Sequence, residues 1–179
     1  MIRAIAFDGN GVLYYRTSDF TDALIHYIHE TYMPNLNLEH AVALQLKFMH
    51  EAFDNLISKE DALTRFMNSI GLQDPEARRD ILSKELEFSK DIHLFPGERE
   101  TLLELSLRGF RLGMITNSYQ SASEKASWFR ALGLDCIAEN IVSSIDVGVS
   151  KPDSRIYLEF ANRVCFEPKE IAFVGHEEA

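Results

Sequence analysis

The sequence is poor in cysteine and has neither a long apolar run nor an excess of positive charge. Cys136 and Cys165 are its only cysteines and stand in no ligand motif, so we expect a reducing, cytoplasmic setting and no disulfide scaffold. The 28 Asp and Glu outnumber the 18 Lys and Arg, which disfavours binding to nucleic acid. The first apolar run, residues 2–7, is too short for a signal peptide or a membrane span. We therefore expect no nucleic-acid partner and no membrane partner.

The sequence does contain enough apolar residues for a core, since 46% of its 179 residues are hydrophobic. Helical spacing over 19–33 and 38–57, a capping pattern at Ser58 and Asp61, and Asp74-Pro75 predict four consecutive helices. For the second of these helices we expect one buried apolar stripe, made of Leu38, Val42, Leu46, Met49, Phe53, Leu56 and Ile57. We therefore predict a helical cap domain over 17–91, inserted into a core domain made of 1–16 and 92–179.

The remaining sequence alternates between short apolar strands and helices. Strands are predicted at 2–7, 111–116, 141–144 and 171–175, and helices at 98–108, 121–133 and 153–164. Such alternation implies right-handed crossovers and a parallel sheet. The predicted fold is an α/β, doubly wound, Rossmann-like core with the inserted α-helical cap.

The last predicted strand has an unusual setting. Residues 171–174 are of the kind that is buried on both faces of a sheet, yet the sequence ends at Ala179. An uncovered strand edge invites pairing with another chain. We therefore expect that the C-terminal part of the core is missing, or that a partner, such as the second copy in a homodimer, covers this strand.

Polar residues follow all four strands: Asp8, Thr116-Asn117-Ser118, Lys151-Pro152 and Gly175-His176. The carboxyl ends of parallel strands meet at one edge, where open α/β sheets bind their ligands. The order and spacing of these residues resemble the haloacid dehalogenase-like superfamily, whose members are mostly magnesium-dependent phosphatases with an aspartate nucleophile. The resemblance covers essentially the whole chain, and the helical insertion is similar to the cap of that family.

The resemblance implies a role for each of these residues. Asp8 is the nucleophile, Thr116 and Asn117 bind the substrate, and Lys151 neutralises the charge of the phosphoryl group. A Mg²⁺ ion is held by Asp8 and by the backbone carbonyl of Asn10. Physically, a carboxylate can attack phosphorus once a metal and a lysine reduce the repulsion between the two anions.

Two positions depart from the family's phosphatases. Asn10 stands where they carry a second aspartate, and an amide has no titratable proton to transfer, which typically costs about 10²–10⁴ in rate. His176 stands where they carry an acidic metal ligand, and Mg²⁺ prefers oxygen ligands. We interpret His176 as an ordinary loop residue, with Glu177 or Glu178 as the replacement ligand.

Three functions stay open on this basis. The first is a magnesium-dependent phosphatase that acts on a small phosphorylated metabolite through an aspartyl-phosphate, with activity weakened by Asn10. The second is a 2-haloacid dehalogenase, in which Asp8 displaces a halide without a proton or a metal. The third is a catalytically degenerate member that binds a ligand or regulates a partner. The sequence names no substrate.

Overall fold

The structure is a computed structural model, and it describes residues 1–176. The chain divides into two compact units. Unit 1 contains Met1–Tyr15, Phe53–Asn55 and His93–Ala179, and unit 2 contains Arg16–Ala52 and Leu56–Ile92. That the helical unit acts as a cap over a site stays a prediction.

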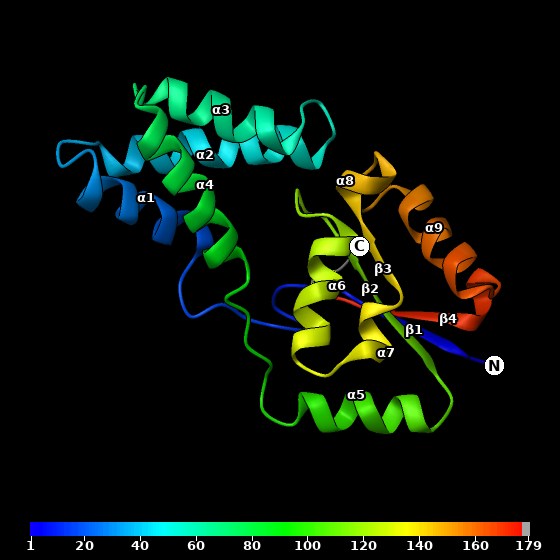
Figure 1. Ribbon diagram of the computed structural model, residues 1–179. Coiled ribbons are helices and arrows are strands. Elements are labelled where there is room, and N and C mark those ends of the chain that lie inside the picture. Colours follow the sequence, from blue (N-terminus) through cyan, green and yellow to red (C-terminus); the bar gives the residue numbers. More distant parts are fainter. Residues whose placement is uncertain (177–179) are drawn as a thin grey trace. The chain divides into compact units, whose positions relative to one another are not determined.

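Unit 1 is built on a sheet of four parallel strands, in the order β3-β2-β1-β4 (Figure 1). The strands are β1 (Ala4–Phe7), β2 (Arg111–Thr116), β3 (Ile141–Ser143) and β4 (Ile171–Val174). Phe7 pairs with Met114 on one side and with Val174 on the other, so the residues that follow β1, β2 and β4 emerge at the same edge. This confirms the predicted Rossmann-like α/β fold.

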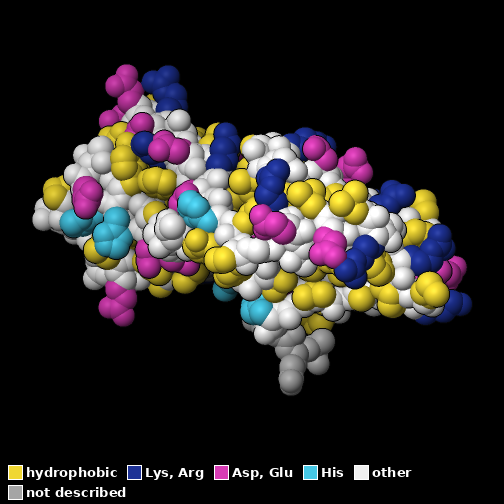
Figure 2. Space-filling model, turned by 90° about the horizontal axis from the view of Figure 1, so that it is seen from below, with side chains coloured by type: hydrophobic (Ala, Val, Ile, Leu, Met, Phe, Trp, Pro, Cys, Tyr) yellow, Lys and Arg dark blue, Asp and Glu magenta, His cyan; other side chains and the backbone are white. Residues whose placement is uncertain are grey.

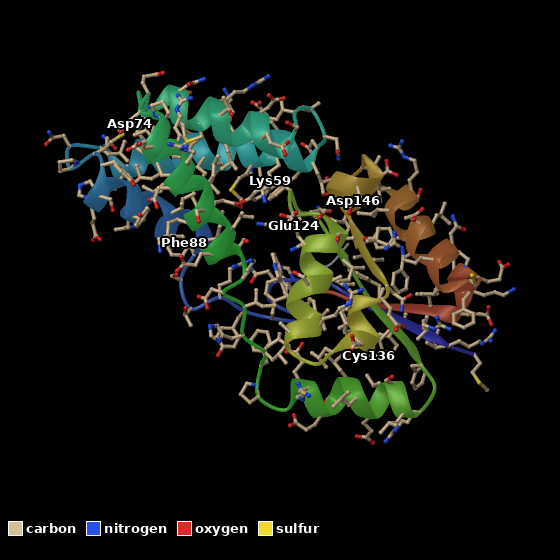
Figure 3. The ribbon with its side chains drawn as sticks, in the orientation of Figure 1. Lys59, Asp74, Phe88, Glu124, Cys136 and Asp146 are labelled. Carbon is tan, nitrogen blue, oxygen red and sulfur yellow. The ribbon has the colours of Figure 1, made fainter. Side chains whose placement is uncertain are left out.

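Helices cover both faces of this sheet. Figure 1 shows α5 (Glu98–Leu107), α6 (Ala122–Ala131) and α7 (Asp135–Ala138) on one side, and α9 (Ser154–Val164) on the other. The short helix α8 (Ser144–Val147) follows β3, and a 3₁₀ turn, η1 (Pro168–Glu170), precedes β4. Ser121 and Glu124 form the predicted capping box at the start of α6, which is labelled at Glu124 in Figure 3. This reciprocal bonding satisfies backbone N–H groups that would otherwise lack partners.

One part of the core of unit 1 lies between the sheet and α9. Its fully buried members include Ala6, Ile115 and Phe160. Gly113 allows this packing, because a Cβ there would lie 2.1 Å from the carbonyl oxygen of Asn140 and 2.6 Å from Cε2 of Phe160. A glycine in the middle of a strand commonly marks such a close approach.

Unit 2 is entirely helical in its described elements. They are α1 (Phe20–Thr31), α2 (Leu38–Phe53, whose last residue is grouped with unit 1), α3 (Lys59–Ser69) and α4 (Pro75–Ser89). As predicted, Ser58 accepts a hydrogen bond from the backbone of Asp61, and Asp74 caps α4 ahead of Pro75. Tyr27 and Tyr32 both donate to the carboxylate of Asp80, which ties α1 to α4.

The buried face of α2 differs from the predicted stripe. The buried side chains are Ala41, Gln45, Phe48 and Ala52, whereas Leu46 is 38% exposed. The buried face therefore lies beside the predicted one, and two of its four residues are alanines. The helix also ends at Phe53 rather than at Ile57, because Asn55 adopts a left-handed φ of 56°.

Strand β4 is the least covered strand of the sheet. It pairs with β1, and its side chains Phe173 and Val174 are 39% and 42% exposed. That a partner or a further segment covers it stays a prediction. On the face shown in Figure 2, hydrophobic side chains are scattered among Lys, Arg, Asp and Glu. Within residues 1–176, no helix combines the length and the hydropathy needed to cross a membrane.

Candidate active site

Asp8 follows β1 and begins a tight turn. Its backbone N–H donates to the carbonyl of Val174 at 2.8 Å, and its Oδ1 accepts from the N–H of Gly9 at 2.7 Å. The carbonyl of Gly9 then accepts from Val12 and Leu13, at 3.2 and 2.8 Å. A Cβ on Gly9 would lie 3.1 Å from Oγ1 of Thr116, so glycine lets the turn lie close to the end of β2.

Lys151 lies against this carboxylate. Its Nζ is 2.6 Å from Oδ1 of Asp8, and the two side chains are only 14% and 16% exposed. The ammonium also lies 5.4 Å from the ring centroid of Phe173. A partly buried pair of this kind is screened less by water than a surface pair. The structure thus brings together the two residues that the resemblance implied as nucleophile and charge-neutralising group.

Thr116 is the last residue of β2, and Asn117 follows it at the same edge of the sheet. Asn117 Oδ1 accepts from the N–H of Lys151 at 2.7 Å, and Nδ2 donates to the Lys151 carbonyl at 3.2 Å. The side-chain amide predicted to bind substrate therefore also holds the Lys151 backbone. In the described chain, the buried hydroxyl of Thr116 donates only to the Asn117 carbonyl, at 3.5 Å, which is longer than an ordinary hydrogen bond.

His176 also lies at the nucleophile. Its Nδ1 is 3.4 Å from Oδ2 of Asp8, and its side chain is half-exposed. The sequence predicted an ordinary loop histidine at this position, and its contact with Asp8 was not anticipated. Glu177 and Glu178, the predicted replacement ligands, lie outside the described residues.

These residues surround a cavity of about 480 Å³, which is a typical size for a small-molecule site. All of its lining residues belong to unit 1. They are Asp8, Asn10, Thr116, Asn117, Lys151, Pro152, Tyr157, Phe173, Gly175 and His176.

Sequence reasoning missed two residues of this wall, Tyr157 and Phe173. Their rings meet edge to face, with centroids 5.5 Å apart. Burial, and then the negative charge of Asp8, raise the pKa of the Tyr157 hydroxyl. Tyr157 lies on α9, six residues after Lys151, and that spacing on a helix following the Lys151 loop was the available signal.

The donors at the cavity fit a magnesium ion that has few protein ligands. The Asp8 carboxylate and the Asn10 carbonyl are hard oxygen donors, and Mg²⁺ commonly completes its shell with water and substrate phosphate. His176 does not suit this ion, since neutral imidazole favours other metals. Among residues 1–176, no three His, Cys, Asp or Glu side chains gather into a metal cluster.

Comparison with known proteins identifies relatives of two activities. The chain is 28% identical over 127 residues to (S)-2-haloacid dehalogenase 4A of Burkholderia cepacia, covering 71% of this chain and 53% of that protein. It is 28% identical over 183 residues to glyceraldehyde 3-phosphate phosphatase of Methanothermobacter thermautotrophicus, covering 99% of this chain and 78% of that protein. The chain thus spans about half the length of the dehalogenase it matches.

Solved structures share the fold. The 2-haloacid dehalogenase of Pseudomonas syringae superposes with a TM-score of 0.72 at 23% identity, covering 99% of this chain and 79% of that one. The family model of haloacid dehalogenase-like hydrolases matches residues 2–179. With its parallel sheet and with Asp8, Thr116 and Lys151 at one cavity, the chain belongs to the haloacid dehalogenase-like hydrolases.

Proposed function

We propose that this hydrolase cleaves small phosphate monoesters, with Asp8 as the nucleophile. The observation that carries the proposal is the 2.6 Å contact between Lys151 Nζ and Asp8 Oδ1 at a cavity lined by further polar groups. A phosphoryl group entering this cavity meets both the attacking carboxylate and a cation that offsets its charge.

The reaction follows from what each side chain can do. An oxygen of Asp8 forms a bond to phosphorus while the bond to the leaving alcohol oxygen breaks, which gives an aspartyl-phosphate. Lys151 and the hydroxyl of Thr116 stabilise the phosphoryl oxygens. Water then attacks phosphorus, releases inorganic phosphate and restores the carboxylate. A magnesium ion held by Asp8 and the Asn10 carbonyl supplies further positive charge to the phosphoryl group when bound.

Asn10 lowers the expected rate of ester hydrolysis. The leaving alkoxide must take its proton from solvent, since an amide cannot give one, and the loss of general acid–base help typically costs about 10²–10⁴ in rate. We therefore expect slow turnover with esters of poorly acidic alcohols. Esters with an acidic leaving group, such as p-nitrophenyl phosphate, depend less on that proton.

Hydrolysis of p-nitrophenyl phosphate, with and without Mg²⁺, tests the proposal. We expect slow release of p-nitrophenol that Asp8→Asn abolishes and Asn10→Asp accelerates. Asp135→Asn, an exposed carboxylate on α7, is the matched control and should leave the rate unchanged. No release by the wild-type chain and none gained by Asn10→Asp would refute the phosphatase proposal.

A second candidate is hydrolytic dehalogenation of a small 2-haloacid. Two observations favour it. Asn10, which lines the cavity, has no titratable proton to give, and a leaving halide needs none. Among the described residues, His176 lies at Asp8 where the family's phosphatases carry an acidic metal ligand. Asp8 would displace halide from carbon to form an ester, which water then cleaves to the 2-hydroxyacid. Halide release from 2-chloropropionate in the presence of EDTA, lost in Asp8→Asn, would favour this reaction. Loss of both activities would favour a binding or regulatory role.

A further inference from the structure

Lys125 is a buried lysine that the proposed chemistry does not use. It lies on α6, directly after Glu124, which Figure 3 labels, and it is only 2% exposed. Its Nζ donates to the hydroxyl of Tyr14 at 3.1 Å and lies 4.7 Å from the ring centroid of Trp128. Within residues 1–176, Lys125 forms no ion pair.

This environment makes Lys125 costly for the fold. A buried ammonium without an acidic partner loses its hydration, and a phenol oxygen and an aromatic face return only part of that loss. Methionine has a similar length and no charge, so it would fill the same space at lower cost. A residue kept at such a cost is expected to serve something other than stability.

The group that Lys125 holds, Tyr14, closes the turn at the nucleophile. The carbonyl of Tyr14 accepts from the N–H of Gly11 at 2.8 Å, and its ring lies 3.4 Å from where a Cβ of Gly9 would be. The ring also packs edge to face on Phe129, with centroids 6.2 Å apart. Tyr14 is 3% exposed, so its ring is confined on several sides while its hydroxyl is held by Lys125.

We propose that Lys125 is a positioning residue: through the Tyr14 hydroxyl it fixes the turn that presents the Asp8 carboxylate and the Asn10 carbonyl. The kinetic part of this proposal rests on the proposed function. The hydrogen bond anchors the ring at its far end, and the ring faces the turn at Gly9. Small displacements of a reacting group reduce the rate by large factors, so a single hydrogen bond that holds the turn in place is enough to change kcat.

Lys125→Met and Tyr14→Phe each remove the anchor and keep the packing. We expect each to lower kcat for p-nitrophenyl phosphate by about 10-fold with KM nearly unchanged. The double variant should lose no more than either single variant, because both remove the same hydrogen bond. Lys169→Met, an exposed lysine of the same unit, is the matched control for the lost charge and should keep the wild-type kcat.

Thermal unfolding separates positioning from a structural role. Lys125→Met should unfold at the wild-type temperature or higher, since it removes a buried charge, while kcat falls. A fall in kcat that only tracks a fall in unfolding temperature would overturn the proposal.

Amide hydrogen exchange gives a readout that needs no turnover. The N–H groups of Val12 and Leu13 close the turn onto the Gly9 carbonyl, and we expect them to exchange about 10-fold faster in both single variants. If the wild-type chain hydrolyses no ester, the proposed function fails, and the exchange rates alone decide the role of Lys125. Unchanged exchange in both variants would overturn that role.

Discussion

The side-chain amide of Asn117 binds both backbone groups of Lys151, accepting from its N–H at 2.7 Å and donating to its carbonyl at 3.2 Å. This pair ties the end of β2 to the loop before α9. The ammonium of Lys151 reaches Asp8 from that loop. The position of the cation at the nucleophile therefore depends on an amide from another strand.

Asn117→Ala should release the Lys151 loop. We expect kcat for p-nitrophenyl phosphate to fall by about 10²-fold, because a cation misplaced by an ångström loses most of its effect on the phosphoryl group. The measurement is steady-state kinetics, with circular dichroism to confirm folding. Asn162→Ala, an exposed amide on α9, is the control. Equal kcat in Asn117→Ala and wild type would mean that Lys151 is placed without this amide.

Lys151→Met removes the cation itself. We expect kcat to fall by about 10²–10³-fold, the usual loss when one electrostatic donor is taken from a reaction centre. Binding of inorganic phosphate, measured by calorimetry, should weaken in parallel. Phosphate affinity equal to that of wild type would show that Lys151 does not face the ligand.

Gly113→Ala tests the packing of the sheet on α9. The added methyl would lie 2.1 Å from the Asn140 carbonyl oxygen and 2.6 Å from Phe160, so both the backbone and the Phe160 ring must shift. We expect the free energy of unfolding in urea to fall by about 3 kcal/mol, at the upper end of ordinary overpacking costs. Glu100→Ala, on the exposed part of α5, should change it little. A stability within roughly 0.5 kcal/mol of wild type, the scatter of surface substitutions, would contradict the close approach of Asn140 to Gly113.

The raised pKa of Glu98 predicts that the stability of the protein depends on pH. Burial raises its pKa from 4.5 to about 7, against the lowering effect of a hydrogen bond from the Phe95 N–H. Between these values the folded state holds more protons than the unfolded state, so the free energy of unfolding falls as the pH rises from 4.5 to about 7. Glu98→Gln keeps the shape and removes the titration.

The comparison is the melting temperature of wild type and Glu98→Gln across this range. The wild-type value should drop relative to that of the variant as the pH rises, and the difference should become constant above a pH of about 7. Parallel curves at every pH would show that Glu98 titrates like an exposed acid.

Local signals predicted much of the fold, because the interactions that they encode are local. Ser121 and Glu124 cap α6 through backbone groups within one turn, and Asp74-Pro75 starts α4 in the same way. The predicted buried stripe of α2 was wrong because burial depends on packing between helices, which is not a local property. Apolar periodicity shows where hydrophobic residues gather on a helix, whereas the face that packs depends on the neighbouring helix and on small residues such as Ala41.

The sequence by itself determined the strand–helix alternation, the placing of Asp8 and Thr116 at strand ends, and the placing of Lys151 shortly before a helix, since strand period and turn residues are local properties. Only the tertiary structure decided the contacts between distant segments: Asn117 with the Lys151 backbone, His176 with Asp8, and Lys125 with Tyr14. Such contacts join residues far apart in the chain, and their geometry depends on sheet register and helix packing, which no short stretch of sequence encodes.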